Sequence, residues 1–474
     1  MNVLKKVRKN KKIKFNFNSF SSTTMDAGIG IGGLSINKDE ITSSKYDLYA
    51  PIYIDKSVRK SHNLSIYPNS STDSKGPFVF EIPADPGKFT DLETLRLHGR
   101  MRIRKQTTAG EANLAKDEKV STVNNIFDSL WSSVKVEVNS TEITDPSSSW
   151  YAYKAYLEKL LSYSKATKEN VLNSKGFIQD KADKYDDVGS ESEDSGNDGF
   201  NTRKEMFEGS KWVYFCSNLH IDLTTIRRVL PPNIKLTLTF QRNSDEFCLL
   251  APKQNRYFIE LKDLKITLNK NELSHDIENN YLTSLKKGKF PLLPMDRSLL
   301  KTFTKTPGTS DLTIYNAFST NQLPEQIFVV IVDEKAHAGD IALNPYHFKV
   351  NNLKEASLIV NGVHEPSELY KLDIDTGDKV DLYTSFLENT GVSTTEDRDF
   401  GVSINDYYNG SFILAWDRTP DRCNRFHVHE MGSGQININL KTKTPITTTV
   451  RVIVYATYSS YLQIEEDKII TPNF

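Results

Sequence analysis

Few residues in this chain have the types and spacing that chemistry requires. His427-Val428-His429 would place two imidazoles on one face of a strand, a spacing that can bind a metal ion. Glu430 would point to the opposite face, and no third ligand is evident beside the pair. We therefore interpret both histidines as strand-edge or surface residues, and we predict neither a metal site nor a cofactor.

A glycine-rich stretch is the second candidate. Gly28-Ile29-Gly30-Ile31-Gly32-Gly33 formally matches the phosphate-binding pattern GxGxxG. A dinucleotide site needs a strand before this pattern and a helix after it. The flanking residues, Ser21–Thr24 and Ser35–Lys38, suit neither element, so we expect a flexible tail.

Other catalytic signatures do not occur in the sequence. It has no nucleophile-elbow, zinc-protease, P-loop or protein-kinase motif. Asp and Glu together number 61, so a pair of carboxylates has no diagnostic force. We predict that the protein is not an enzyme, with a glycosidase built from distant carboxylates as the alternative.

The N-terminal segment is basic, although the formal net charge of the chain is −1. Its cations precede the first acidic residue, Asp26: Lys5, Lys6, Arg8, Lys9, Lys11, Lys12 and Lys14. Such arms neutralise phosphates without sequence preference. We interpret residues 1–45 as a flexible arm that contacts nucleic acid, with a solvated tail as the equal alternative.

The cysteines and the apolar runs of the sequence indicate which cellular compartments the protein suits. The three cysteines, Cys216, Cys248 and Cys423, are scattered and odd in number, which argues against a disulfide framework. The longest clean apolar run, Ile327–Val332, has the length of a strand, so we predict no membrane span. The basic N-terminus lacks the apolar core of a secretory signal.

The rest of the chain favours strands. Phe and Tyr number 24 and 21, and Val, Ile and Thr dominate the apolar runs. Alternating apolar and polar residues predict strands, most clearly at Phe78–Ile82, Leu92–Arg104 and Val134–Val138. The expected fold class is all-β, with short helices in the loops.

One such helix follows the third of these strands. Tyr153, Tyr156, Leu157 and Leu160 recur at helical spacing and form an apolar stripe. A tyrosine stripe is more often a packing surface than a ligand site. We therefore predict that Tyr153 and Tyr156 belong to a helix that covers the loop end of the first sandwich.

Residues 183–201 form an acidic segment that is rich in Gly and Ser and nearly free of apolar side chains. Such a segment buries too little surface to become ordered. Its carboxylates do not have the spacing of an EF-hand loop, which leaves calcium binding as a minor alternative. We predict an exposed insertion loop on the outer surface.

A weak internal repeat links the two halves of the chain. Val136–Ser140 and Leu358–Gly362 each consist of a strand that ends in Asn and a small residue. Glu208-Gly209-Ser210 and Asn409-Gly410-Ser411 each precede a later strand. The interval from the strand-ending Asn to this Gly-Ser pair is longer in the first half than in the second, by about the length of the acidic segment.

The distance along the chain from an upstream Phe to the strand-ending Asn is also similar in the two halves. Phe78 precedes Asn139 by nearly as many residues as Phe303 precedes Asn361. We infer a duplication, marked by Asn139, Asn361 and Gly410. Many short strands with long crossing loops are typical of jelly rolls. The prediction is a double jelly roll, which consists of two tandem eight-stranded β-sandwiches.

This duplication divides the chain into domains. Residues 46–270 are predicted to form jelly roll 1, with the acidic insertion at 183–201. Residues 271–298 carry a lysine cluster and two prolines, and they are interpreted as a linker. Residues 299–474 are predicted to form jelly roll 2.

Several of these stretches resemble a known family. They are Tyr46–Tyr49, Thr122–Phe127, Val136–Asn139, Tyr153–Tyr163, Leu219–Leu223, Asp245–Leu249, Gln322–Pro324, Tyr407–Gly410 and Asp417–Asp421. Together they are similar to the hexon-like major capsid protein of Polinton/Maverick elements and adintoviruses, over about residues 45–465.

The resemblance implies a homotrimer of pseudo-hexagonal outline that tiles an icosahedral viral shell. Its partners would be neighbouring capsomers, a minor capsid or penton protein and, non-specifically, the packaged DNA. Its location would be the virion, after synthesis in the cytoplasm or nucleus of the host. The alternatives are a penton-like minor capsid protein and a carbohydrate-binding β-sandwich.

Overall fold

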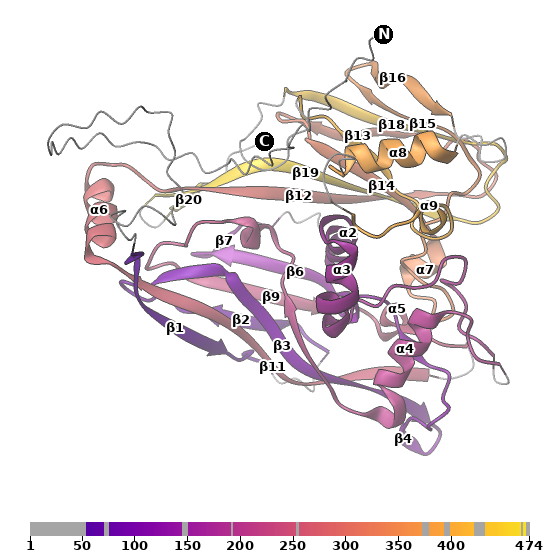
Figure 1. Cartoon of the computed structure of the whole chain (residues 1–474), viewed down its shortest axis with the longest axis horizontal. Helices are drawn as coiled ribbons and strands as arrows, with labels where there is room; N and C mark the ends of the chain where they lie inside the picture. Colours follow the sequence, from indigo (N-terminus) through magenta and orange to yellow (C-terminus); the bar gives the residue numbers. More distant parts are fainter. Residues whose placement is uncertain are drawn as a thin grey trace, which may run out of the picture. The chain divides into compact units, whose positions relative to one another are not determined.

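The computed structural model describes the larger part of the chain (Figure 1). The described residues are 54–70, 75–144, 150–190, 193–252, 256–371, 379–392, 399–420, 432–465 and 468–470. By their contacts, Met1–Asp55 and Lys56–Phe474 are separate units, and the fold is that of the second. The cations Lys5–Lys14, the glycine-rich stretch, Cys423, His427 and His429 lie outside the described residues.

The first sandwich, indigo to pink in Figure 1, consists of two antiparallel sheets. The larger sheet has the order β1-β11-β3, and both β8 and β4 pair with β3. Its strands are β1 (Val58–Ile66), β3 (Phe89–Thr107), β4 (Gly110–Asn113), β8 (Val213–Asn218) and β11 (Arg256–Leu273). The other sheet has the order β2-β9-β6-β7, with β2 (Phe78–Ile82), β6 (Trp131–Val138), β7 (Thr141–Glu142) and β9 (Leu236–Arg242). A small ladder joins β5 (Ser121–Thr122) to β10 (Leu249–Leu250).

The second sandwich, salmon to yellow in Figure 1, repeats this strand order. One sheet runs β12-β19-β14-β17, with β20 added to β19. Its strands are β12 (Leu292–Lys305), β14 (Gln326–Asp333), β17 (Leu414–Asp417), β19 (Val450–Glu465) and β20 (Lys468–Ile470). The other sheet runs β13-β18-β15-β16, with β13 (Ile314–Thr320), β15 (Leu353–Val360), β16 (Val363–Lys371) and β18 (Gly434–Thr442). Eight strands thus have equivalent partners in each half, which is the arrangement of a jelly roll repeated in tandem.

Helices occupy the loops between these strands. They are α1 (Ile126–Ser129), α2 (Tyr151–Ser162), α3 (Lys165–Thr167), α4 (Asp198–Met206), α5 (Asp245–Cys248), α6 (His275–Lys286), α7 (Glu334–Ala338), α8 (Lys379–Asn389) and α9 (Ile404–Tyr408). Helices α2 to α4 lie between β7 and β8, and α8 and α9 lie in the equivalent connection between β16 and β17. The predicted linker, 271–298, contains α6 together with the end of β11 and the start of β12.

The alternation of apolar and polar residues along the strands determines which side chains form the core. On β3 the side chains of Leu95, Leu97 and Met101 are buried, and they belong to the same cluster as Phe78 and Phe80 of β2. The two sheets therefore pack face to face through their apolar sides.

Asn139 and Asn361 occupy equivalent turns. Each starts a two-residue hairpin loop, β6–β7 and β15–β16, in which both loop residues have positive φ: 47° and 69° in the first, 50° and 86° in the second. Each Asn Oδ1 accepts a backbone N–H from the neighbouring strand, at 2.9 Å from Lys235 and 2.9 Å from Gln435. Asn suits this position because its short amide tolerates the left-handed conformation and bonds locally.

One anchor of the internal alignment was wrong. Phe78 lies on β2, whose equivalent in the second sandwich is β13, whereas Phe303 lies on β12, the equivalent of β1. Alternating aromatic residues occur in many strands of such a chain, so a similar spacing alone did not identify the same strand.

Replacement of Asn361 tests the turn. Asn361→Ala should lower the free energy of unfolding by about 1–3 kcal/mol, because it loses the bond to Gln435 and strains a positive-φ residue. Asn361→Gly is the matched control, since it loses only the hydrogen bond and should destabilise less. Thermal unfolding of the three proteins checks this order, and an alanine variant as stable as the wild type would contradict it.

Candidate functional site at the junction of the two sandwiches

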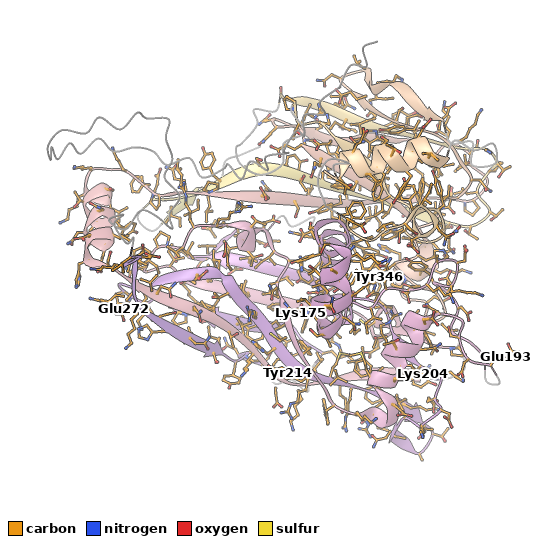
Figure 2. The ribbon with its side chains drawn as sticks, viewed as in Figure 1. Lys175, Glu193, Lys204, Tyr214, Glu272 and Tyr346 are labelled. Carbon is orange, nitrogen blue, oxygen red and sulfur yellow. The ribbon has the colours of Figure 1, made fainter. Side chains whose placement is uncertain are left out.

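The tyrosine stripe of α2 faces the second sandwich. Tyr156 stacks on Tyr346 with ring centroids 4.1 Å apart and an interplanar angle of 12°. Tyr153 stacks on His337 of α7 at 5.6 Å, and Figure 2 labels Tyr346 beside α2. Both tyrosines are buried, as expected of a packing surface, but they lie against the second sandwich and do more than cover the first.

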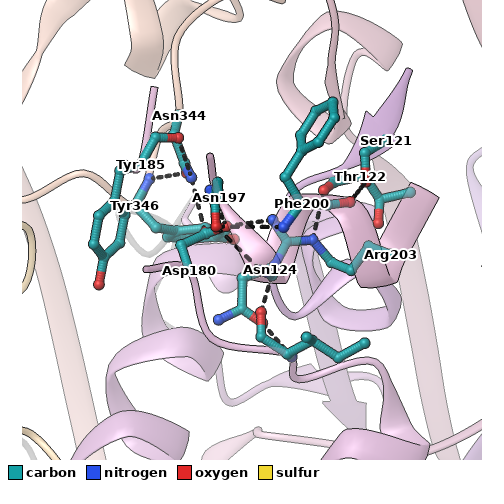
Figure 3. A network of polar contacts seen from close by, with 12 residues as sticks. Ser121, Thr122, Asn124, Asp180, Tyr185, Asn197, Phe200, Arg203, Asn344 and Tyr346 are labelled. Atoms are coloured by element: carbon teal, nitrogen blue, oxygen red, sulfur yellow. Dashed lines mark hydrogen bonds and ion pairs between the residues drawn. The ribbon is translucent and has the colours of Figure 1, made fainter. Parts of the chain in front are cut away.

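A buried ion pair forms the centre of the polar contacts at this junction (Figure 3). Arg203 of α4 pairs with Asp180, and the two side chains are 1% and 0% exposed. Arg203 Nε also donates to the Thr122 carbonyl at 2.8 Å, so the guanidinium links α4 to β5. A buried charge pair is tolerated when its remaining donors and acceptors are satisfied.

The other oxygen of Asp180 reaches the second sandwich. Asn344 Nδ2 donates to Asp180 at 2.9 Å and to the Tyr185 carbonyl at 3.2 Å. Asn197 Nδ2 donates to the oxygen that Arg203 also contacts, at 2.8 Å. Loop residues of both sandwiches therefore converge on one carboxylate, as Figure 3 shows.

Part of the acidic segment belongs to this junction, so the prediction of an exposed, unordered loop at 183–201 was wrong for its buried residues, although Lys184 and Asp194 are exposed as predicted. Tyr185, Asn197 and Phe200 are each at most 1% exposed. The Tyr185 hydroxyl bonds to Ser411 at 2.8 Å, and the Asp183 N–H donates to the Asn409 carbonyl at 2.9 Å. Partners in the second sandwich thus compensate for the shortage of apolar residues.

Gly410 is required by this contact. Its φ is 145°, and a Cβ placed there would lie 2.1 Å from the ring of Tyr185. A side chain at this position would displace the tyrosine, which gives the predicted mark Gly410 a physical role.

Two further carboxylates, those of Asp186 and Glu158, make contacts across the junction. Asp186 accepts a bond from His347 at 2.6 Å and lies 3.3 Å from the Lys349 ammonium. Burial alone would raise the pKa of Asp186, but the bond to His347, the charges of His347 and Lys349 and a backbone bond outweigh it and hold this pKa below its ordinary value.

Glu158 of α2 is held in the same way. One of its oxygens bonds to His220 at 2.8 Å, and the other accepts the Tyr455 hydroxyl of β19 at 3.0 Å. Burial would raise the pKa of Glu158, but the charge of Lys154 and the bonds to His220 and Tyr455 lower it overall. A carboxylate with a lowered pKa is a poor general acid.

A cavity of about 650 Å³ lies beside Glu158, and its lining includes His220, Arg228, Asp296 and Ser460. A glycosidase needs one carboxylic acid with a raised pKa opposite a second carboxylate. The pKa of Glu158 is shifted in the opposite direction, so Glu158 does not suit the role of that acid.

Neither a metal centre nor a membrane segment emerges from the described residues. No group of three or more His, Cys, Asp or Glu side chains there is arranged to hold a metal ion. None of the helices in the same part of the chain is long and apolar enough to cross a membrane.

Sequence reasoning missed Asp180, Arg203 and Asn344. They are far apart along the chain and occur in no motif, so only the fold brings them together. The tyrosine stripe was the one signal in the sequence that pointed to this surface.

Tyr156 tests the aromatic part of the junction. Tyr156→Ala should cost about 2–4 kcal/mol of stability, because the buried ring leaves a cavity. Tyr156→Phe keeps the ring and should be close to wild type. Tyr315, which is 72% exposed, provides a matched truncation that should cost less than about 1 kcal/mol. Equal effects of both alanine variants on the unfolding midpoint would contradict the assignment.

Acid should weaken the junction. A carboxylate whose folded pKa lies below its unfolded value stabilises the protein above the unfolded pKa, and this contribution is lost as pH falls through the folded pKa. Glu158→Gln should therefore lower the melting temperature near neutral pH, and its difference from wild type should shrink below about pH 4. A difference that does not change with pH would contradict this account of Glu158.

Comparison with known proteins identifies one similar sequence. The chain is 23% identical over 401 residues to the uncharacterized protein F54H12.2 of Caenorhabditis elegans, covering 83% of this chain and 92% of that protein. No model of a known protein family matches the chain.

Solved structures share the fold. A chain in the cryo-EM structure of the Sputnik virophage superposes with a TM-score of 0.60 at 10% identity, covering 92% of this chain and 93% of that one. The Faustovirus major capsid protein superposes with a TM-score of 0.55 at 10% identity, covering 88% and 92%. The two tandem sandwiches are matched as a unit, and the chain has the all-β double jelly-roll fold.

Proposed function

We propose that this chain is a major capsid protein whose homotrimers, of pseudo-hexagonal outline, tile an icosahedral viral shell. The observation that carries the proposal is the superposition on the Faustovirus major capsid protein, which includes both sandwiches and 92% of that chain. The sequence resemblance adds the Polinton and adintovirus lineage. The role is structural and not catalytic, and its place is the virion, after synthesis in the cytoplasm or nucleus of the host.

The repeated strand order supports the trimer. Three chains contribute six jelly rolls of one topology, and a threefold assembly of them has a nearly sixfold outline. This outline requires a fixed relation between the two sandwiches of a chain. The buried contacts of Asp180, Tyr185 and Tyr156 across the junction supply such a relation.

The tandem sandwiches also favour the major capsid protein over the penton-like alternative, which would need a single jelly roll. Neighbouring trimers and a penton protein are the proposed partners. Within the part of the chain that the structure describes, no observation favours a carbohydrate-binding role.

The oligomeric state tests this proposal. Light scattering across micromolar concentrations should give a mass three times that of the chain, since stable assemblies of this kind bury large interfaces. A monomer at every concentration would argue strongly against it.

The basic arm is proposed to contact the packaged DNA. Deletion of residues 1–14 should abolish the retention of DNA, and retention by the full chain should fall steeply as salt rises. Deletion of residues 28–33 is the matched control, because it shortens the arm without removing a charge. Unchanged binding after the first deletion would refute the contact.

A further inference from the structure

A lysine, an asparagine and an aspartate meet in the buried contact between α1 and α2. Lys159 Nζ lies 2.7 Å from Asn125 Oδ1, and it also donates to Asp128 Oδ2. The three residues are 2%, 0% and 1% exposed, so water does not separate them. An amine, a carboxamide and a carboxylate are thus in direct contact and shielded from solvent.

Local structure fixes the positions of Asn125 and Asp128. Asn125 precedes α1 in the left-handed conformation, with a φ of 55°, and its carbonyl accepts the Asp128 N–H at 3.1 Å. Asp128 is oriented by the Tyr151 hydroxyl at 3.1 Å and by the Ser217 hydroxyl at 3.3 Å. Burial and the charge of Asp128 raise the pKa of Tyr151 well above its ordinary value, so this hydroxyl keeps the proton that it donates.

The amide of Asn125 is only half satisfied. Its Oδ1 faces the lysine, whereas its buried Nδ2 has no hydrogen-bond partner in the described part of the chain. An unbonded buried amide nitrogen costs free energy. Replacing it by the nitrogen of Lys159 would remove both this cost and the buried charge of the lysine.

We propose that Lys159 and Asn125 form an intramolecular isopeptide bond, with Asp128 as the group that transfers the proton. The inference goes beyond the capsid role and does not depend on it. It assigns to this cluster a covalent self-modification for which the chain itself supplies both reactants.

The reaction balances without an external reagent. The Lys159 ammonium gives one proton to Asp128, to which it already donates a hydrogen bond. The neutral Nζ then attacks the Asn125 Cγ, and a C–N bond forms as the carbonyl becomes tetrahedral. Asp128 relays a proton from Nζ to Nδ2, the Cγ–Nδ2 bond breaks, and ammonia leaves. The products are a secondary amide, one molecule of ammonia and a protonated Asp128, which keeps the proton that the ammonium gave up, with no change in oxidation state.

The bond would close a loop through the chain. Asn125 precedes α1 and Lys159 lies on α2, so the loop contains β6 and β7 of one sheet. A covalent closure of this kind restricts the unfolded chain and so favours the folded one. It would also fix α2, which carries the tyrosines of the junction.

Intact mass of the full-length protein under denaturing conditions tests the proposal. The expected mass is that of the sequence less one ammonia, and peptide mapping should find a branched peptide that joins Asn125 to Lys159. A mass equal to that of the sequence would overturn the proposal. A loss of ammonia that maps to Asn361-Gly362 or Asn409-Gly410 in place of Asn125 would overturn it too, because Asn-Gly pairs lose ammonia when they form succinimides. Hydroxylamine distinguishes the two products, since it cleaves a succinimide and leaves an isopeptide intact.

Variants separate the roles of the three residues. Lys159→Arg keeps the positive charge without the primary amine and should abolish the ammonia loss, and Asp128→Asn should abolish it or slow it severely. Lys154→Arg is the matched control, since this buried lysine of the same helix pairs with Asp222, and it should keep the full loss. A branched peptide that persists in Lys159→Arg would overturn the assignment.

Discussion

The buried pair of Asp180 and Arg203 is the contact on which the relation between the two sandwiches depends. A charge pair with less than 2% exposure is stable only when every remaining donor and acceptor finds a partner. Here the partners come from β5, from the segment before α4 and, through Asn344, from the second sandwich. The contacts of Tyr156, Tyr185 and Glu158 add to it, so the two jelly rolls are joined by buried side chains as well as by the chain through α6.

The strands could be predicted from the sequence because burial of one face imposes alternation. Phe78–Ile82 has the bounds expected for it, and the predicted Val134–Val138 strand lies within β6. The asparagine turns were visible because a positive φ at a hairpin restricts the residue type, as Asn139 and Asn361 illustrate.

The junction could not be predicted in the same way. Its polar residues have no periodicity, and Asp180, Arg203 and Asn344 become neighbours only through the tertiary fold. The acidic segment shows the same limit, because composition predicts disorder only when no partner surface exists. Tyr185 has such a surface, over Gly410 and against Ser411.

The central proposal is that two jelly rolls joined by buried contacts form one third of a six-lobed building block, and electron microscopy of the purified protein tests it most directly. The account predicts triangular trimers with a six-lobed base, in which each chain accounts for two adjacent lobes. Isolated two-lobed monomers, or fivefold rings of single lobes, would contradict it.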